Sequence, residues 1–229
     1  MLLSIHVPKT AGNSFREALL RTFGARVFTD YGDWAGFNLP EVNARRQARE
    51  TAMRTRRDEL LASYDVIHGH FIADKYLGLF PEAEFIAFFR DPYQQAIAHY
   101  HFVKRNPQRP HPEARIVQER QMSLTEYLEW DAFHNHQSQF LGSLSIEDLA
   151  FVGLSERYEQ SLDLFAHTFG HNLGEPFFEN VNEGRMTQGY GVGPDERRVI
   201  ERTRAADIEL YRRARERFAR QSRRMRISA

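Results

Sequence analysis

The chain has 229 residues, of which 41% are hydrophobic and 13% aromatic, a composition typical of a folded globular protein. Its 31 basic and 31 acidic residues give a formal net charge of zero, which argues against a general binder of polyanions such as nucleic acid. The absence of cysteine excludes disulfides, thiol catalysis and zinc sites built on thiolates.

The first predicted elements form a strand, a loop and a helix. Leu2–Val7 has the pattern of a short buried strand, and Pro8–Asn13 that of a tight loop. Ser14–Phe23 is predicted as a helix, because its apolar residues fall on one face and Gly24 follows its end. A loop between a strand and a helix is where open α/β sheets bind phosphate groups. The sequence therefore predicts an anion site here.

The next stretch alternates irregular, helical and extended segments. Tyr31–Pro40 is rich in glycine and aromatic residues and is predicted as a loop, and the arginine-rich Glu41–Ser63 as a helix. We interpret residues 38–63 as a helical insertion. Tyr64–His68 is a candidate strand. Phe85–Phe89 is the clearest strand, because a continuous apolar run is typical of a parallel strand covered on both faces.

The remaining elements complete an alternating pattern. Asp91 can cap a helix that has Pro92 in its first turn and runs to about Lys104. Further expected segments are a loop over Asn106–Pro112, helices over Leu124–Trp130, Asn135–Leu141 and Ser155 to Gly170, a strand over Phe151–Leu154, a loop over Asn172–Gly193 and a helix from Asp195 to about Arg220. This order predicts one α/β domain over residues 1–229, P-loop-like, with three layers and a mostly parallel central sheet flanked by helices.

The segment His6–Ser14 combines a strand end, small residues, a lysine and the start of a helix, which are the features of a phosphate-binding P-loop. Lys9 is one of only three lysines in the chain. However, Lys9 precedes Gly12, whereas the lysine of an ordinary ATPase or GTPase loop follows the glycine. The pattern therefore favours an anion-binding loop of another kind.

His6–Ser14 resembles the 5'-phosphosulfate-binding loop of the carbohydrate sulfotransferases, the group that includes the heparan sulfate 2-O-sulfotransferases and their bacterial relatives. Arg90–Tyr100 (RDPYQQAIAHY) resembles the 3'-phosphate-binding segment of that family, and Val66–Phe71 (VIHGHF) resembles its His-Gly-His segment. Weaker similarities lie in Asn135–Gly142 and Val152–Tyr158. The resemblance spans residues 2–170 in family order.

The resemblance implies an enzyme that moves a sulfuryl group from 3'-phosphoadenosine-5'-phosphosulfate (PAPS) to a hydroxyl group of a carbohydrate, releasing 3'-phosphoadenosine-5'-phosphate (PAP) without a metal. It implies that Lys9 stabilises charge on the oxygen that leaves the sulfur, as phosphoryl-type transfer requires. Arg90 would bind the 3'-phosphate with its planar fork. The cofactor-binding residues would be Pro8, Lys9, Thr10, Ala11, Gly12, Asn13, Ser14 and Arg90.

Two histidines complete the expected catalytic set. His68 and His70 are two residues apart, so both side chains point to the same side of an extended backbone, and Gly69 between them permits close approach. The resemblance implies that His70 is the general base and His68 a supporting or substrate-orienting group. An imidazole with an ordinary pKa near 6.5 would lose this activity below about pH 6, unless its surroundings shift the pKa.

One mismatch leaves alternatives open. The family has a serine where this chain has Ala98, and an arginine where it has Gln95. Either Gln94, Gln95 or His99 substitutes, or the affinity for the 3'-phosphate is weakened. A non-catalytic nucleotide-binding relative and a small-molecule kinase of another P-loop type are the competing interpretations.

Other patterns are assigned to less specific roles. The spaced pairs His99/His101, His134/His136 and His167/His171 could bind zinc, but the first two fall on expected helices, where side chains two apart diverge, so we expect no metal. The arginines after Asp195 alternate with acidic residues and indicate a solvated face, with a groove for an acidic glycan as the alternative. No apolar run can span a bilayer and no signal peptide is apparent, so we expect a cytoplasmic protein.

Overall fold

The computed structural model describes residues 1–109, 111–176 and 189–228. Its centre is a five-stranded sheet in the order β2-β3-β1-β4-β5, and every neighbouring pair is parallel. The predicted parallel α/β fold is thereby confirmed. The strands are β1 (Leu2–Ile5), β2 (Val27–Thr29), β3 (Val66–Gly69), β4 (Glu84–Phe89) and β5 (Phe151–Leu154).

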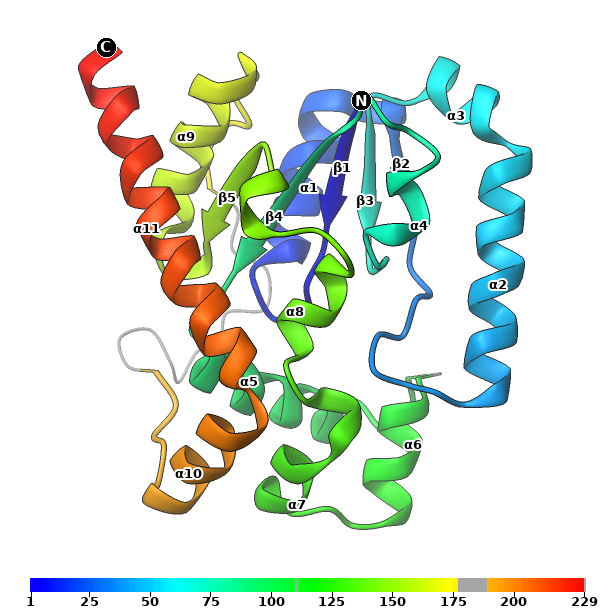
Figure 1. Cartoon of the computed structure of the whole chain (residues 1–229), viewed down its shortest axis with the longest axis vertical. Helices are drawn as coiled ribbons and strands as arrows, with labels where there is room; N and C mark the ends of the chain where they lie inside the picture. Colours follow the sequence, from blue (N-terminus) through cyan, green and yellow to red (C-terminus); the bar gives the residue numbers. More distant parts are fainter. Residues whose placement is uncertain (110, 177–188, 229) are drawn as a thin grey trace.

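Helices cover both faces of the sheet (Figure 1). On one face α1 packs beside α9, with the ring centroids of Phe15 and Phe165 5.6 Å apart. Helices α8 and α11 cross the other face (Figure 1). The bounds are α1 Gly12–Phe23, α2 Pro40–Thr55, α3 Arg57–Ser63, α4 Asp74–Leu77, α5 Pro92–Arg105, α6 Pro112–Glu119, α7 Leu124–Glu129, α8 His136–Leu141, α9 Tyr158–Phe169, α10 Pro194–Thr203 and α11 Ala205–Ser228.

This double covering explains the apolar strands. All residues of Phe85–Phe89 in β4 and all of β1 are buried, whichever face their side chains point to. A strand with solvent on one face would alternate polar and apolar residues, whereas these strands must be apolar throughout.

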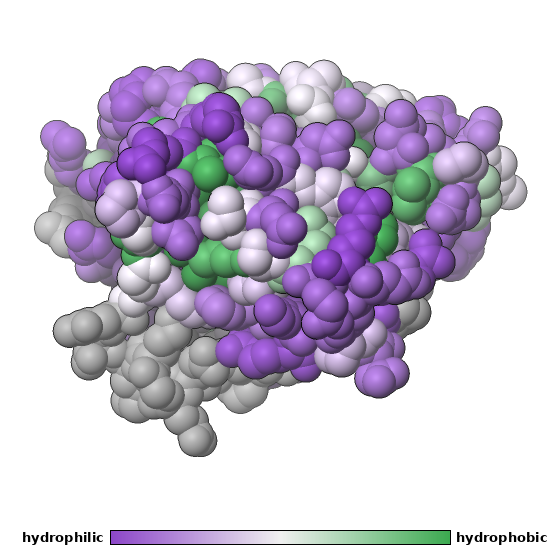
Figure 2. Space-filling model, turned by 90° about the horizontal axis from the view of Figure 1, so that it is seen from below, coloured by the Kyte–Doolittle hydropathy of each residue, from purple (hydrophilic) through white to green (hydrophobic). Residues whose placement is uncertain are grey.

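The carboxyl ends of the strands point toward α5, α6, α7 and α10, which gather at one end of the molecule (Figure 1). Strands β2 and β3 lie on one side of β1, and the later strands β4 and β5 lie on its other side. Ligands of open α/β sheets bind beside such a reversal of strand order, outside the carboxyl ends. Viewed from that end, hydrophobic patches lie between hydrophilic side chains (Figure 2).

Several sequence-based expectations were wrong. Strand β2 and helices α4 and α6 were not predicted, because three, four and eight residues carry little periodicity. The expected helix over Glu41–Ser63 is divided at Arg56. The expected single helix from Asp195 is divided at Arg204, whose buried guanidinium donates to the carbonyl of Leu128 and to Thr203 Oγ1.

The expected loop over Asn172–Gly193 lies in part outside the described residues, which omit 177–188. Within the described segments, no helix combines the length and the apolar character needed to cross a bilayer.

Candidate active site

The loop between β1 and α1 has an unusual backbone. Lys9 and Ala11 both adopt positive φ angles, 66° and 70°, although neither is glycine. Successive N–H groups of a backbone with left-handed residues form a concave nest for anions, and the N-terminus of α1 adds its positive dipole end. Non-glycine residues keep such angles only when their surroundings enforce them, which is typical of functional sites.

Thr10 is one of the groups that enforce this conformation. It is fully buried, and its Oγ1 donates a hydrogen bond to the carbonyl of Val7 at 2.8 Å. The hydroxyl therefore stabilises the loop from inside. Thr10 can contribute to an anion site through its backbone N–H.

Lys9 extends from the loop toward α5. Its Nζ lies 4.3 Å from the centroid of the Phe102 ring, a cation–π distance. Phe102 and Pro8 both line a cavity. Lys9 is thus placed where the loop meets this cavity.

Arg90 directly follows β4 and lies beside the loop. One guanidinium nitrogen donates to the carbonyl of Lys9 at 3.1 Å. The backbone of Arg90 is held by the Gln137 side chain, which accepts from its N–H at 3.0 Å and donates to its carbonyl at 2.9 Å. The structure therefore brings together two segments that are 81 residues apart in the sequence.

Helix α8 is itself fixed by Asp207 of α11. The Asp207 carboxylate accepts from the backbone N–H groups of Gln137 and Ser138 and from the Ser138 hydroxyl. Sequence reasoning missed Asp207, and it identified Gln137 only as part of the weak similarity over Asn135–Gly142. The signal was weak, because a helix-capping aspartate is recognisable only when it precedes its own helix.

A cavity of about 580 Å³, its open mouth included, adjoins the loop. Its walls come from the loop after β2, the end of β3 and helices α5, α6 and α8. The lining residues are Pro8, Asp33, Trp34, Ala35, Phe37, His70, His99, Phe102, Val103, Asn106, Arg109, His111, Glu113, Ala114, Phe133, His136 and Phe140.

His70 lines this cavity as a neutral imidazole. Its Nδ1 lies 2.5 Å from the carbonyl oxygen of His6, so Nδ1 carries the proton, because a carbonyl can only accept. Burial lowers the pKa of His70 to about 4, although the bond to His6 acts in the opposite direction. Nε2 is then the unprotonated nitrogen, as a general base requires.

His68 has a different place. It is 1% exposed, does not line the cavity, and its Nδ1 lies 2.8 Å from Ser4 Oγ. Burial lowers its pKa to about 3. Between His68 and His70 stands the imidazole of His6, with ring centroids 5.1 Å and 4.2 Å away. His68 therefore lies behind the cavity wall, not in it.

Gln94, Gln95 and His99 are the candidates to replace the serine that the family has at Ala98. All three form hydrogen bonds within the protein. Gln94 exchanges two hydrogen bonds with the backbone of Tyr190. Gln95 donates to the carbonyl of Pro8 at 2.9 Å, and His99 Nδ1 lies 2.8 Å from the Tyr127 hydroxyl. Gln95 thus stabilises the loop between β1 and α1 through the carbonyl of Pro8.

The members of the pairs His99/His101 and His134/His136 have different partners in the structure. His99 stacks instead on His136, with ring centroids 5.0 Å apart, and both line the cavity. His101 contacts Tyr190, while His134 lies against the carbonyl of Glu129. No group of three or more potential metal ligands occurs among the residues that the structure describes.

Comparison with solved structures found similar proteins that are sulfotransferases. The sulfotransferase from Alicyclobacillus acidocaldarius shares 15% identity with a TM-score of 0.48, over 91% of this chain and 92% of that chain. Mouse sulfotransferase SULT7A1, complexed with PAP, shares 12% identity with a TM-score of 0.43, over 90% of this chain and 65% of that chain. No protein-family model matches the chain, and a search of curated proteins found no match.

Proposed function

We propose that this chain is a sulfotransferase that moves a sulfuryl group from PAPS to a hydroxyl group, with carbohydrate as the acceptor class that the sequence resemblance implies. The observation that carries the proposal is the anion nest at Lys9 and Ala11, which opens beside a cavity lined by the neutral imidazole of His70. The nest suits a phosphosulfate group, and the cavity suits the acceptor.

The donor would be held by the backbone of Pro8–Ser14 and by Arg90. The N–H groups around the two left-handed residues match an anion that needs several donors at once. A guanidinium has five N–H donors, so the bond from Arg90 to the Lys9 carbonyl is compatible with binding a phosphate. No protein group in this set requires a metal.

In the transfer step, the acceptor oxygen forms a bond to sulfur while the bond from sulfur to the phosphate oxygen breaks and PAP is released. His70 Nε2 accepts the proton of the acceptor hydroxyl. Lys9 supplies positive charge to the departing oxygen, where negative charge grows in the transition state. His68 and His6 keep His70 in place from behind.

Thermal unfolding with PAP, adenosine 5'-phosphate and ATP tests the donor site, because a ligand that binds only the native state raises the melting temperature. PAP should stabilise most, since its 3'-phosphate adds a charge-assisted contact with Arg90. Equal shifts for PAP and adenosine 5'-phosphate would contradict the role of Arg90. A larger shift with ATP would favour the kinase interpretation.

Transfer of labelled sulfate from PAPS to a panel of glycans and small alcohols tests the reaction itself. Sulfation of at least one acceptor is expected. Binding of PAP with no transfer to any acceptor would favour the non-catalytic interpretation.

A further inference from the structure

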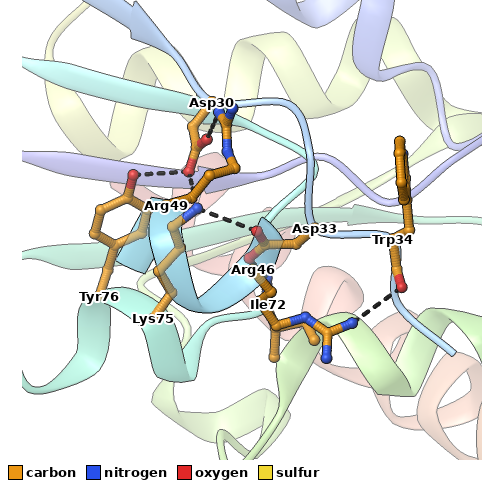
Figure 3. A network of polar contacts seen from close by, with 8 residues as sticks. All are labelled: Asp30, Asp33, Trp34, Arg46, Arg49, Ile72, Lys75 and Tyr76. Carbon is orange, nitrogen blue, oxygen red and sulfur yellow. Dashed lines mark hydrogen bonds and ion pairs between the residues drawn. The ribbon is translucent and has the colours of Figure 1, made fainter. Parts of the chain in front are cut away.

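Two carboxylates line the cavity, and they differ in how their oxygens are paired. Asp33 Oδ1 accepts from Lys75 Nζ at 3.1 Å, and its Oδ2 accepts from the backbone N–H of Ile72 at 3.2 Å. Lys75 in turn binds Asp30, which also accepts from Tyr76 and Arg49 (Figure 3). Asp33 therefore belongs to a closed structural network.

Glu113 of α6 is the other carboxylate, and its pairing is incomplete. Its side chain is 13% exposed, and Oε1 lies 3.5 Å from His111 Nδ1, a long contact. Oε2 is buried and accepts no hydrogen bond from another residue in the described part of the chain. A buried polar atom without a partner lowers stability, and a donor group of a bound ligand would supply the missing partner.

The described residues packed around Glu113 do not supply the missing hydrogen bond to its Oε2. Its neighbours Ala114 and Val117 belong to a buried apolar cluster with Tyr127 and Phe133. Burial raises the pKa of Glu113 to about 7, although its own backbone N–H and Arg109 act in the opposite direction. Glu113 lines the cavity within an otherwise apolar wall, and its Oε2 has no hydrogen-bond partner among the described residues.

The other residues that line the cavity indicate which kind of molecule it can bind. Five aromatic side chains line it, namely Trp34, Phe37, Phe102, Phe133 and Phe140. Aromatic walls bind the faces and edges of ring compounds. The mouth of the cavity is open to solvent, so a single ring can enter between these walls.

We propose that Glu113 is a specificity-determining residue, which accepts a hydrogen bond from an O–H or N–H group that a single-ring acceptor carries apart from the hydroxyl that reacts. This rests on the proposed function, which makes the cavity the acceptor site, and it replaces the carbohydrate that the resemblance implies with a single-ring compound that suits aromatic walls. His70 and Glu113 stand on different walls, the end of β3 and α6, so one ligand can contact both with different groups.

Three ring compounds with the same phenol group serve as probes. Para-ethylphenol has no second donor, tyrosol carries a second hydroxyl, and tyramine carries an ammonium group. Calorimetric titration of the wild-type chain at about pH 8, above the Glu113 pKa of about 7, should give dissociation constants for tyrosol and tyramine about tenfold lower than for para-ethylphenol, the worth of one hydrogen bond to a charged group. Equal affinities, or no binding of any probe at millimolar concentration, would overturn the proposal.

Two variants separate the donor contact from packing. Glu113→Met removes both oxygens and should abolish the preference while para-ethylphenol binds at least as well as before. Glu113→Gln keeps one acceptor oxygen without the charge, so tyramine should lose more affinity than tyrosol. The matched control is Glu119→Met on the exposed side of the same helix, which should leave all three constants unchanged. A preference that survives in Glu113→Met would refute the assignment.

The titrations require no PAPS and no turnover. Failure of the proposed function would appear as absence of PAP binding and of sulfate transfer, with the probe preference intact. Failure of the Glu113 assignment would appear as loss of the preference while PAP still binds.

Discussion

The imidazole of His6 packs directly on the backbone of Gly12. A Cβ atom at Gly12 would lie 1.8 Å from His6 Cδ2 and 2.0 Å from Nε2, far inside van der Waals contact. The same imidazole lies 4.2 Å from the ring of His70, and the carbonyl of His6 holds His70 Nδ1. The anion loop and the candidate base are therefore fixed by one shared residue.

Gly12→Ala should disturb both halves of the site. The new methyl group must displace His6, and overpacking of this kind costs about 1–3 kcal/mol of unfolding free energy. We expect a lower melting temperature and loss of the stabilisation by PAP. Gly78→Ala is the matched control, because nothing lies within 4 Å of its Cβ position. A Gly12→Ala protein with wild-type stability and PAP binding would refute the relationship between the two residues.

Lys9→Met should separate chemistry from binding. Charge that Lys9 stabilises grows only as the sulfur–oxygen bond breaks, so kcat should fall by about a hundredfold or more, while the Kd for PAP rises less than tenfold. Single-turnover transfer of labelled sulfate and calorimetry with PAP measure the two quantities. Lys104→Met, which removes an exposed lysine of α5, should change neither.

His70→Ala should lose most turnover and retain PAP binding, since general-base catalysis contributes about 10²–10⁴ in rate. Burial lowers the pKa of His70 to about 4, which is the shift that would move the acid limb away from about pH 6. In the pH profile of kcat/KM, the His70 limb should therefore lie near pH 4 if the protein remains folded. Near-full turnover of His70→Ala would contradict its assignment as the base.

Stability should decrease between pH 7 and pH 5. Burial lowers the pKa of His68 and of His136 to about 3 and that of His70 to about 4, and it also lowers the pKa of His6 and His99. Below about pH 6.5 these imidazoles bind protons only in the unfolded chain, so each removes about 1.4 kcal/mol of unfolding free energy per pH unit. The contribution is complete above pH 6.5 and is lost as the pH falls toward the folded pKa.

Three carboxyl groups oppose this trend. The pKa values of Glu113, Asp33 and Asp207 are raised by burial, so their protonation favours the folded state as the pH falls. Five imidazoles outweigh three carboxyls, and the melting temperature measured by circular dichroism should drop. His167→Gln, on the exposed side of α9, should leave the dependence unchanged. A melting temperature that is constant or rises toward pH 5 would contradict the buried neutral cluster.

The sequence alone determined the α/β fold class and the place of the loop. Phe85–Phe89 was recognisable as a buried strand because both of its faces are apolar, and Pro8–Asn13 as a loop because it lies between a strand and a helix. These signals are local, since periodicity and capping depend on neighbours along the chain. The interpretation of Lys9, His70 and Arg90 as one site came from the family resemblance and remains a prediction.

Tertiary structure decided which side chains meet. Gln137 reaches the backbone of Arg90 from 47 residues away, and His99 stacks on His136 rather than pairing with its sequence neighbour. Whether Glu113 lacks a partner depends on every wall of the cavity. Such contacts depend on packing between elements, which leaves no periodic trace in the sequence, because the same helix pattern is compatible with many neighbours.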